Sequence, residues 1–135
     1  TLADELKLDF VLVDTHPGIN EETLLSTAIA DSLLMVMRPD SQDYLGTAVA
    51  IEVAERLDAA DIRLVVNKLP NHFDKDSVRD RVASSYGVPL GALLPLSEDL
   101  LTLASSGLAV LEYPNHAWSD GVRALAEQLI ADLSE

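Results

Sequence analysis

The sequence contains no cysteine. This excludes a disulfide framework, cysteine-ligated zinc and a thiol nucleophile. It is compatible with a reducing compartment, so we expect a cytoplasmic protein. No apolar run approaches the ~18–20 residues that cross a bilayer, and the chain does not open with a charged segment followed by an apolar one, as a secretory signal would. We therefore expect neither a transmembrane helix nor a signal peptide.

Positive charge is also scarce. The chain has 9 Lys and Arg residues against 23 Asp and Glu residues, which gives a formal net charge of −14. A surplus of negative charge repels phosphate backbones and anionic lipid headgroups. The last residues, 130–135, are acidic and offer no basic amphipathic face for a membrane. We predict that this segment alone binds neither nucleic acid nor a membrane surface.

The apolar content is sufficient for one core. Over 135 residues, 48% are apolar and 24% are charged, which is typical of a single globular domain. Four short apolar runs lack the alternation of half-buried strands, and this pattern is typical of parallel strands with both faces covered. These runs span residues 10–13, 33–37, 62–66 and 90–94.

Segments with helical periodicity follow the apolar runs. Asn20 precedes a helix whose first turn holds Glu21 and Glu22, where acidic side chains complement the helix dipole, and Gly87 before Pro89 indicates a helix end. The predicted helices span residues 21–29, 43–57, 75–86, 98–107 and 119–133. Strands and helices alternate, so we predict one α/β domain over residues 1–135: a doubly wound, mostly parallel sheet with helices on both faces.

In such sheets, ligands bind at the carboxyl ends of the strands. Asp14 ends the first run, and Gly18 lies just before a helix start. A carboxylate there can hold a hydrated Mg²⁺, Gly18 allows close backbone approach, and the helix offers free N–H groups to an anion. The alternative is an ordinary strand-to-helix turn in which Asp14 only satisfies local N–H groups.

The later runs also end in polar residues. Arg38 could reach an anionic ligand, or it could be a surface arginine paired with a nearby aspartate. Asn67 follows the third run, and its amide suits the edge of a purine base, although a turn residue is the alternative. Pro95 follows the fourth run and could form a wall beside a base, together with Ser97, which a helix cap explains equally well.

The sequence carries no common catalytic signature. It contains no His-Glu-x-x-His, Gly-x-Ser-x-Gly or Gly-x-Gly-x-x-Gly motif. His72 and its neighbouring aspartates are typical of a solvated loop, and His116 before the last helix is interpreted as structural. His16 lies in the motif after the first run and could sit near phosphate.

The ordered set of segments resembles the MinD/ParA group of deviant Walker-type P-loop ATPases. Residues 10–18, FVLVDTHPG, are similar to the strand and switch II segment of that group. Residues 30–40 resemble its "Ala-Asp, apolar strand, Pro-Asp" stretch, and LVVNK resembles the strand with its adenine-contacting Asn. Residues 93–114 resemble its closing segment: a Leu-Pro wall, a helix, a Gly and a further strand.

The resemblance implies roles for five residues. The Asp at position 14 would act through water on Mg²⁺ and on the attacking water, and the Gly at position 18 would meet the γ-phosphate. Asn67 would read adenine, and Pro95 would line the base. Ser97 stands about where many members carry Asp, and would contribute a polar contact to the cofactor.

The sequence departs from the family in lacking its phosphate-binding loop. No Gly-x-x-x-x-Gly-Lys-Ser/Thr motif occurs, and without it nothing cradles the β- and γ-phosphates or offsets their charge, which is most of phosphoryl-transfer catalysis. We expect this chain to be the C-terminal half of such an ATPase and to be inactive alone.

Three functional hypotheses follow. The first is part of a MinD/ParA-like ATPase that binds ATP and Mg²⁺ and switches partners through an ATP-dependent homodimer. The alternative is a non-catalytic α/β protein-interaction module without a phosphate-binding loop. The third, a receiver-like signalling domain phosphorylated on Asp14, is disfavoured because Arg38 and Pro39 stand where a receiver needs Thr or Ser.

Overall fold

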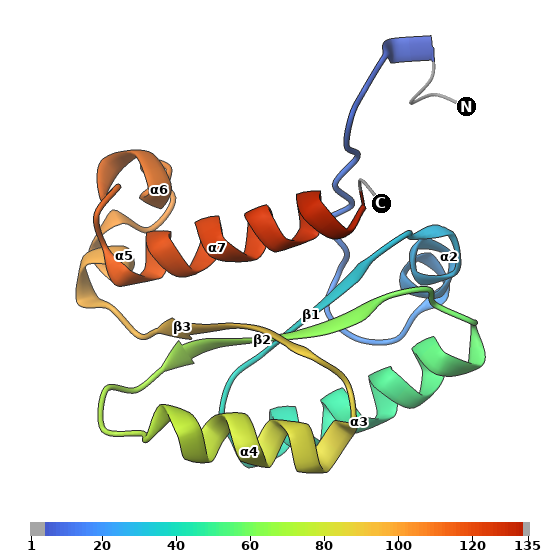
Figure 1. The fold of residues 1–135 in the computed structure, drawn as a ribbon, viewed down its shortest axis with the longest axis horizontal. Coiled ribbons are helices and arrows are strands. Elements are labelled where there is room, and N and C mark those ends of the chain that lie inside the picture. Colours follow the sequence, from blue (N-terminus) through green and yellow to red (C-terminus); the bar gives the residue numbers. More distant parts are fainter. Residues whose placement is uncertain (1–4, 134–135) are drawn as a thin grey trace.

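The computed structural model describes residues 5–133. From residue 21 onward the elements are α2 (Glu21–Ile29), β1 (Leu33–Met37), α3 (Ser41–Arg56), β2 (Ile62–Leu69), α4 (Lys75–Tyr86), β3 (Leu90–Pro95), α5 (Glu98–Leu103), α6 (Ala109–Glu112) and α7 (Ala117–Asp132). Strands and helices alternate along most of the chain, which confirms the predicted α/β class (Figure 1).

The three strands form one parallel sheet in the order β1-β2-β3. On one side of the central strand, Met37 of β1 lies opposite Val66 of β2. On the other side, Leu64 of β2 lies opposite Leu90 of β3. Helix α3 connects β1 to β2, and α4 connects β2 to β3, because parallel neighbours need a crossover rather than a tight turn.

Helices cover both faces of the sheet. In Figure 1, α3 and α4 lie below the strands and α7 lies above them. Leu64 and Val66 of β2 are fully buried in a cluster with Ile51 of α3, whereas Val65 between them packs in a second cluster with Leu125 of α7. Successive strand residues point to opposite faces. Leu64, Val65 and Val66 are therefore apolar without alternation because both faces of β2 are covered there, as predicted.

Most helices begin or end at a residue that caps them. The Asn20 side chain accepts a hydrogen bond from the Thr23 N–H and begins α2, and Gly87 in the left-handed region (φ 67°) ends α4. The predicted bounds of α4 are confirmed. Helix α3 begins two residues earlier than predicted because the Asp40 carboxylate caps it. Helix α7 also begins two residues earlier, because the His116 ring accepts from the Trp118 N–H.

The strand predicted at residues 10–13 is wrong for this structure, where the segment is irregular. Leu12 is 94% exposed, and Val11 and Val13 are each 61% exposed. A strand needs a neighbour that takes up its N–H and C=O groups. The sheet formed by the described residues gives this segment no such neighbour.

The strand implied near residues 108–112 is also wrong, because these residues form the short helix α6. The Glu112 N–H donates to the Leu108 carbonyl, and the Tyr113 N–H donates to the Ala109 carbonyl, at 3.0 and 2.8 Å. These local bonds satisfy the backbone that a strand would have paired with a neighbour. Within residues 5–133, no helix combines the length and the apolar character needed to cross a membrane.

Candidate functional site

A cavity of about 390 Å³ opens where the sheet ends on the side of β2 and β3, within the size range of small-molecule sites. Its wall is mostly apolar, with a few polar groups from β2 and from the start of α5. The lining residues are Asn67, Lys68, Leu96, Ser97, Leu100, Leu101, Leu103, Ala104, Gly107, Ala109 and Trp118. This position, at the carboxyl ends of parallel strands, is where the fold class predicts a ligand.

A bulge in β2 directs Asn67 into this cavity. Val66 lies opposite Leu93 and Leu69 opposite Pro95, so β2 has one more residue than β3 across this step. Lys68 carries the irregularity, with φ at 55°. Bulges re-aim side chains and are frequent beside functional sites.

Backbone strain gathers around the cavity. Ala104, at the end of α5, also has a positive φ, at 46°. Two of the four non-glycine residues with positive φ in the described chain, Lys68 and Ala104, therefore line this one cavity. Left-handed conformations of non-glycine residues cost about 1–3 kcal/mol each and gather at functional sites. The strained backbone thus supports a functional role for the cavity.

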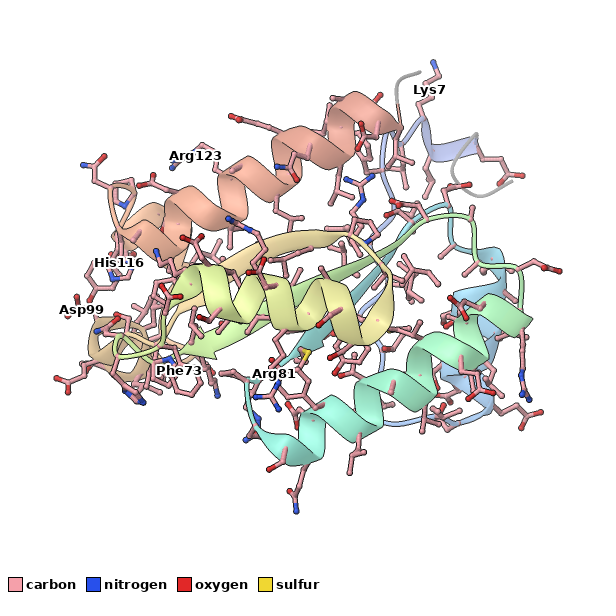
Figure 2. All side chains as sticks on the ribbon, turned by 60° about the horizontal axis from the view of Figure 1, so that its bottom comes forward. Lys7, Phe73, Arg81, Asp99, His116 and Arg123 are labelled. Atoms are coloured by element: carbon pink, nitrogen blue, oxygen red, sulfur yellow. The ribbon has the colours of Figure 1, made fainter. Side chains whose placement is uncertain are left out.

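The first turn of α7 supplies Trp118 to the opposite wall. His116 Nδ1 accepts from the Trp118 N–H at 3.0 Å, and the fully buried Ser119 hydroxyl donates to the Tyr113 carbonyl at 2.7 Å. Figure 2 shows His116 at the same end of the molecule as Phe73 and Asp99, far from Lys7. The turn is thus held on both sides of the indole.

Two glycines bring α7 close to β3. A Cβ atom on Gly121 would lie 2.7 Å from Leu94 Cδ2, and one on Gly91 would lie 2.8 Å from Leu125 Cδ1. A side chain at either position would force the contacting leucine to shift. The close approach positions α7 so that Trp118 reaches across to β2.

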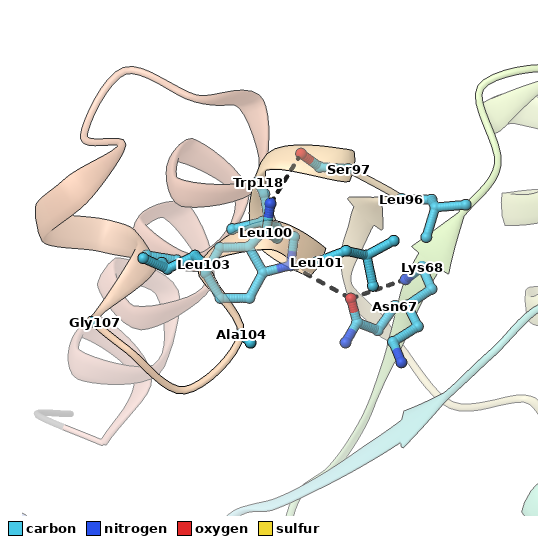
Figure 3. A pocket seen from close by; sticks show the side chains of 11 residues that line it. Asn67, Lys68, Leu96, Ser97, Leu100, Leu101, Leu103, Ala104, Gly107 and Trp118 are labelled. Atoms are coloured by element: carbon cyan, nitrogen blue, oxygen red, sulfur yellow. Dashed lines mark hydrogen bonds between the residues drawn. The ribbon is translucent and has the colours of Figure 1, made fainter.

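The Asn67 amide is held through its oxygen. Oδ1 accepts from the Lys68 N–H at 2.8 Å and from the Trp118 indole Nε1–H at 3.3 Å (Figure 3). Trp118 was not anticipated from the sequence. Its one signal was that the chain's single tryptophan stands at the start of the last helix.

Ser97 lines the same cavity as Asn67, and Pro95 lines a hollow next to it. Ser97 Oγ accepts from the Leu100 N–H at 3.5 Å and caps α5, which fits the capping alternative, while the residue also lines the cavity. Pro95 at the end of β3 lines a neighbouring hollow of about 480 Å³ that shares Leu96, Ser97 and Leu101 with the first. The structure therefore brings Asn67, Ser97 and Pro95 to one end of the sheet.

Asp14 and Gly18 are not among the residues that line either cavity. They lie in the segment that leads into α2, and in Figure 1 this segment stays away from the end of the sheet where α5 and α6 lie. Both residues are exposed, and the Gly18 carbonyl accepts from the Thr23 hydroxyl at 3.1 Å. The Mg²⁺ and phosphate roles of Asp14 and Gly18 stay predictions.

Arg38 is a surface arginine paired with nearby aspartates, which is the second of the two alternatives that the sequence left open. Its guanidinium donates to the Asp43 carboxylate at 3.2 Å and lies 3.4 Å from Asp40. The hydrogen bonds from Arg38 lower the pKa of Asp43, and those to Asp43 raise the pKa of Arg38.

His116 is structural, as expected, because it caps α7. In the described part of the chain, no three His, Asp or Glu side chains gather as metal ligands would.

Comparison with family models finds no match. Among curated proteins, the chain is 24% identical over 124 residues to the uncharacterized ATP-binding protein MJ0547 of Methanocaldococcus jannaschii, covering 91% of this chain and 47% of that protein. It is 30% identical over 112 residues to a putative septum site-determining protein MinD of Emiliania huxleyi, covering 78% of this chain and 41% of that protein.

The fold of the chain is that of solved MinD structures. The MinD cell division protein of Aquifex aeolicus superposes with a TM-score of 0.79 at 18% identity, over 96% of this chain and 58% of that one. The chain is a distant homologue of MinD and related ATP-binding proteins. A MinC:MinD complex from the same organism gives a TM-score of 0.81 at 16% identity, over 96% of this chain and 55% of that one.

The MinD-like chain spans less than half the length of the curated relatives named above, 47% and 41%. The fold that it shares with the Aquifex aeolicus protein extends over 96% of this chain and 58% of that one. What the longer relatives do as whole proteins is therefore a separate question from what this part folds into.

Proposed function

We propose that this chain is the base-binding part of a MinD/ParA-like ATPase, which in the intact protein binds and hydrolyses ATP with Mg²⁺. The cavity at the carboxyl ends of β2 and β3 carries the proposal, because it combines apolar walls with one fixed amide, Asn67. Relatives described as ATP-binding support the choice of ligand.

The residues then have distinct tasks. Asn67 hydrogen-bonds the purine base, and Leu96 and Leu100 form the apolar wall against which the base rests. Ser97 adds a polar contact at this wall, and Pro95 borders the base from the neighbouring hollow. Asp14 acts on Mg²⁺ through water and Gly18 contacts the γ-phosphate. These last two roles require a phosphate-binding loop, which this sequence does not contain, to fix the triphosphate beside them.

Partner switching is part of the same proposal. In the intact protein, ATP would favour a homodimer and so change which protein partner is bound, in the cytoplasm. One structural relative was solved as a complex of MinC with MinD, which supports a protein partner for this fold. The partner of this chain is a protein by this reasoning, and its identity stays open.

The test of base binding is Asn67→Ala in the full-length gene product. Removing the amide should weaken ATP binding by about 1–3 kcal/mol, or about 5- to 150-fold, which is the cost of a lost buried hydrogen bond. Asn115→Ala is the matched control, because Asn115 is exposed and lines neither cavity. Equal ATP affinity of wild type and Asn67→Ala by calorimetry would discard the base-binding role.

The Mg²⁺ role is tested by Asp14→Ala in the same protein. Because Asp14 is exposed and outside the core, the fold should be unchanged while ATP turnover is lost. Turnover that survives the substitution would contradict the role of Asp14 and leave the Asn67 site untouched.

A non-catalytic interaction module is the second candidate. The lack of a phosphate-binding motif in this sequence favours it. Absence of Mg²⁺-dependent ATP binding by the full-length gene product would decide for this candidate over the ATPase.

A further inference from the structure

The Asn67 amide faces the cavity with its acceptor already in use. An amide oxygen has two lone pairs, and in this structure the Lys68 N–H and the Trp118 indole N–H occupy both, at 2.8 and 3.3 Å. Within residues 5–133, no protein group accepts from Asn67 Nδ2. The side chain therefore offers a ligand hydrogen-bond donors only.

The occupied oxygen of Asn67 determines which bases the amide can bind. An asparagine that reads adenine with two bonds accepts from the N6 amino group and donates to N7. A donor-only amide can still donate to N7, but it cannot accept from N6. Guanine presents two acceptors at the same edge, N7 and O6, so a donor-only amide fits guanine at least as well as adenine.

Trp118 holds the amide in this orientation. Its backbone N–H is bound by His116 Nδ1 at 3.0 Å, and the next residue, Ser119, is fully buried with its hydroxyl on the Tyr113 carbonyl. The indole therefore projects from a turn fixed at two points, and Figure 3 shows its nitrogen directed at the Asn67 oxygen.

We propose that Trp118 is a positioning residue that sets the base specificity of the cavity: by occupying Asn67 Oδ1, it makes the amide a donor to purine N7 and allows guanine nucleotides to bind as well as adenine nucleotides. The inference rests on the proposed nucleotide-binding function, and it adds a specificity that this function alone does not imply.

The first experiment measures binding of ATP, GTP and 7-deaza-ATP to the full-length gene product by calorimetry with Mg²⁺. We expect GTP to bind at least as tightly as ATP. The 7-deaza analogue lacks N7, and it should bind about fivefold or more weakly than ATP, which corresponds to one lost hydrogen bond. Wild-type protein suffices here, so the result does not depend on a variant that folds.

The second experiment uses Trp118→Phe, which keeps an aromatic ring but removes the indole donor. The freed Asn67 oxygen can then accept from adenine N6, so the ratio of ATP to GTP affinity should rise about fivefold. Leu100→Ala is the matched control. It enlarges the same cavity without touching the amide, and should weaken both nucleotides by the same factor.

A third readout follows the hydrogen bond itself. The indole N–H resonance of Trp118, assigned by its loss in Trp118→Phe, should move upfield in Asn67→Ala and should shift when GTP or ATP is added.

The outcomes separate the two levels of the proposal. If ATP binds more than tenfold tighter than GTP, or if Trp118→Phe leaves their ratio unchanged, the specificity role of Trp118 is overturned while nucleotide binding stands. If neither nucleotide binds, the proposed function is overturned and the role of Trp118 falls with it.

Discussion

Two apolar runs of similar composition differ sharply in burial in this molecule. Leu64 and Val66 in β2 are fully buried, whereas Leu12 in residues 10–13 is 94% exposed. Both runs predict a strand from sequence alone. The difference is that β2 has a strand on each side and helices on both faces. An apolar run becomes a strand only where neighbours accept its backbone bonds and cover its side chains.

The same contrast separates the helices. Helix α3 contributes Ile51 and Ala54 to the core, and α4 contributes Val78 and Val82, but α2 has no buried residue. Capping and periodicity form α2, yet little apolar surface fixes it to the sheet. Stability should therefore concentrate in residues 33–132, and substitutions before residue 30 should affect it little.

The largest expected effect tests this contrast directly. Leu64→Ala should lower the free energy of unfolding by about 2–5 kcal/mol, because it removes a fully buried side chain and leaves a cavity. Leu12→Ala is the matched change and should cost less than about 0.5 kcal/mol. Urea unfolding measures both. Similar losses at the two positions would show that residues 10–13 are buried in solution.

A medium effect is expected where α4 meets α3. The Tyr86 hydroxyl donates to the Tyr44 carbonyl at 2.9 Å, across 42 residues of sequence. Tyr86→Phe should therefore lower the free energy of unfolding by about 0.5–1.5 kcal/mol, measured by urea unfolding.

Asn20→Ala removes the cap of α2. It should reduce helicity by circular dichroism while leaving the unfolding midpoint nearly unchanged. A large midpoint shift in Asn20→Ala would join α2 to the cooperative core.

The smallest effect concerns pH. The Arg38 hydrogen bonds lower the pKa of Asp43 in the folded state, so the carboxylate contributes stability at neutral pH that is lost as the pH falls through its folded pKa. Wild type should therefore lose this contribution as the pH falls from about 5 through the lowered pKa of Asp43. Asp43→Asn should show a smaller acid-induced decrease over the same range. Parallel pH profiles for the two proteins would contradict a stabilising Arg38–Asp43 pair.

The site was predictable in part. Asn67, Pro95 and Ser97 follow β-runs in the sequence, and the carboxyl-end rule places them at one end of the sheet, where the structure has them beside the cavities. Trp118 was not predictable, because it lies 51 residues from Asn67 and reaches it only through the packing of α7. Asp14 also follows an apolar run, but that run is not a strand here, and Asp14 lines neither cavity.

The sequence by itself determined the alternation of strands and helices, most helix ends and the two-faced burial of β2, because periodicity, caps and apolar runs act over a few residues. Tertiary structure alone decided which runs pair, how the β2 bulge aims Asn67 and which atom of its amide Trp118 holds. Those outcomes depend on groups far apart in the chain, and only the packing of helices against the sheet brings such groups together.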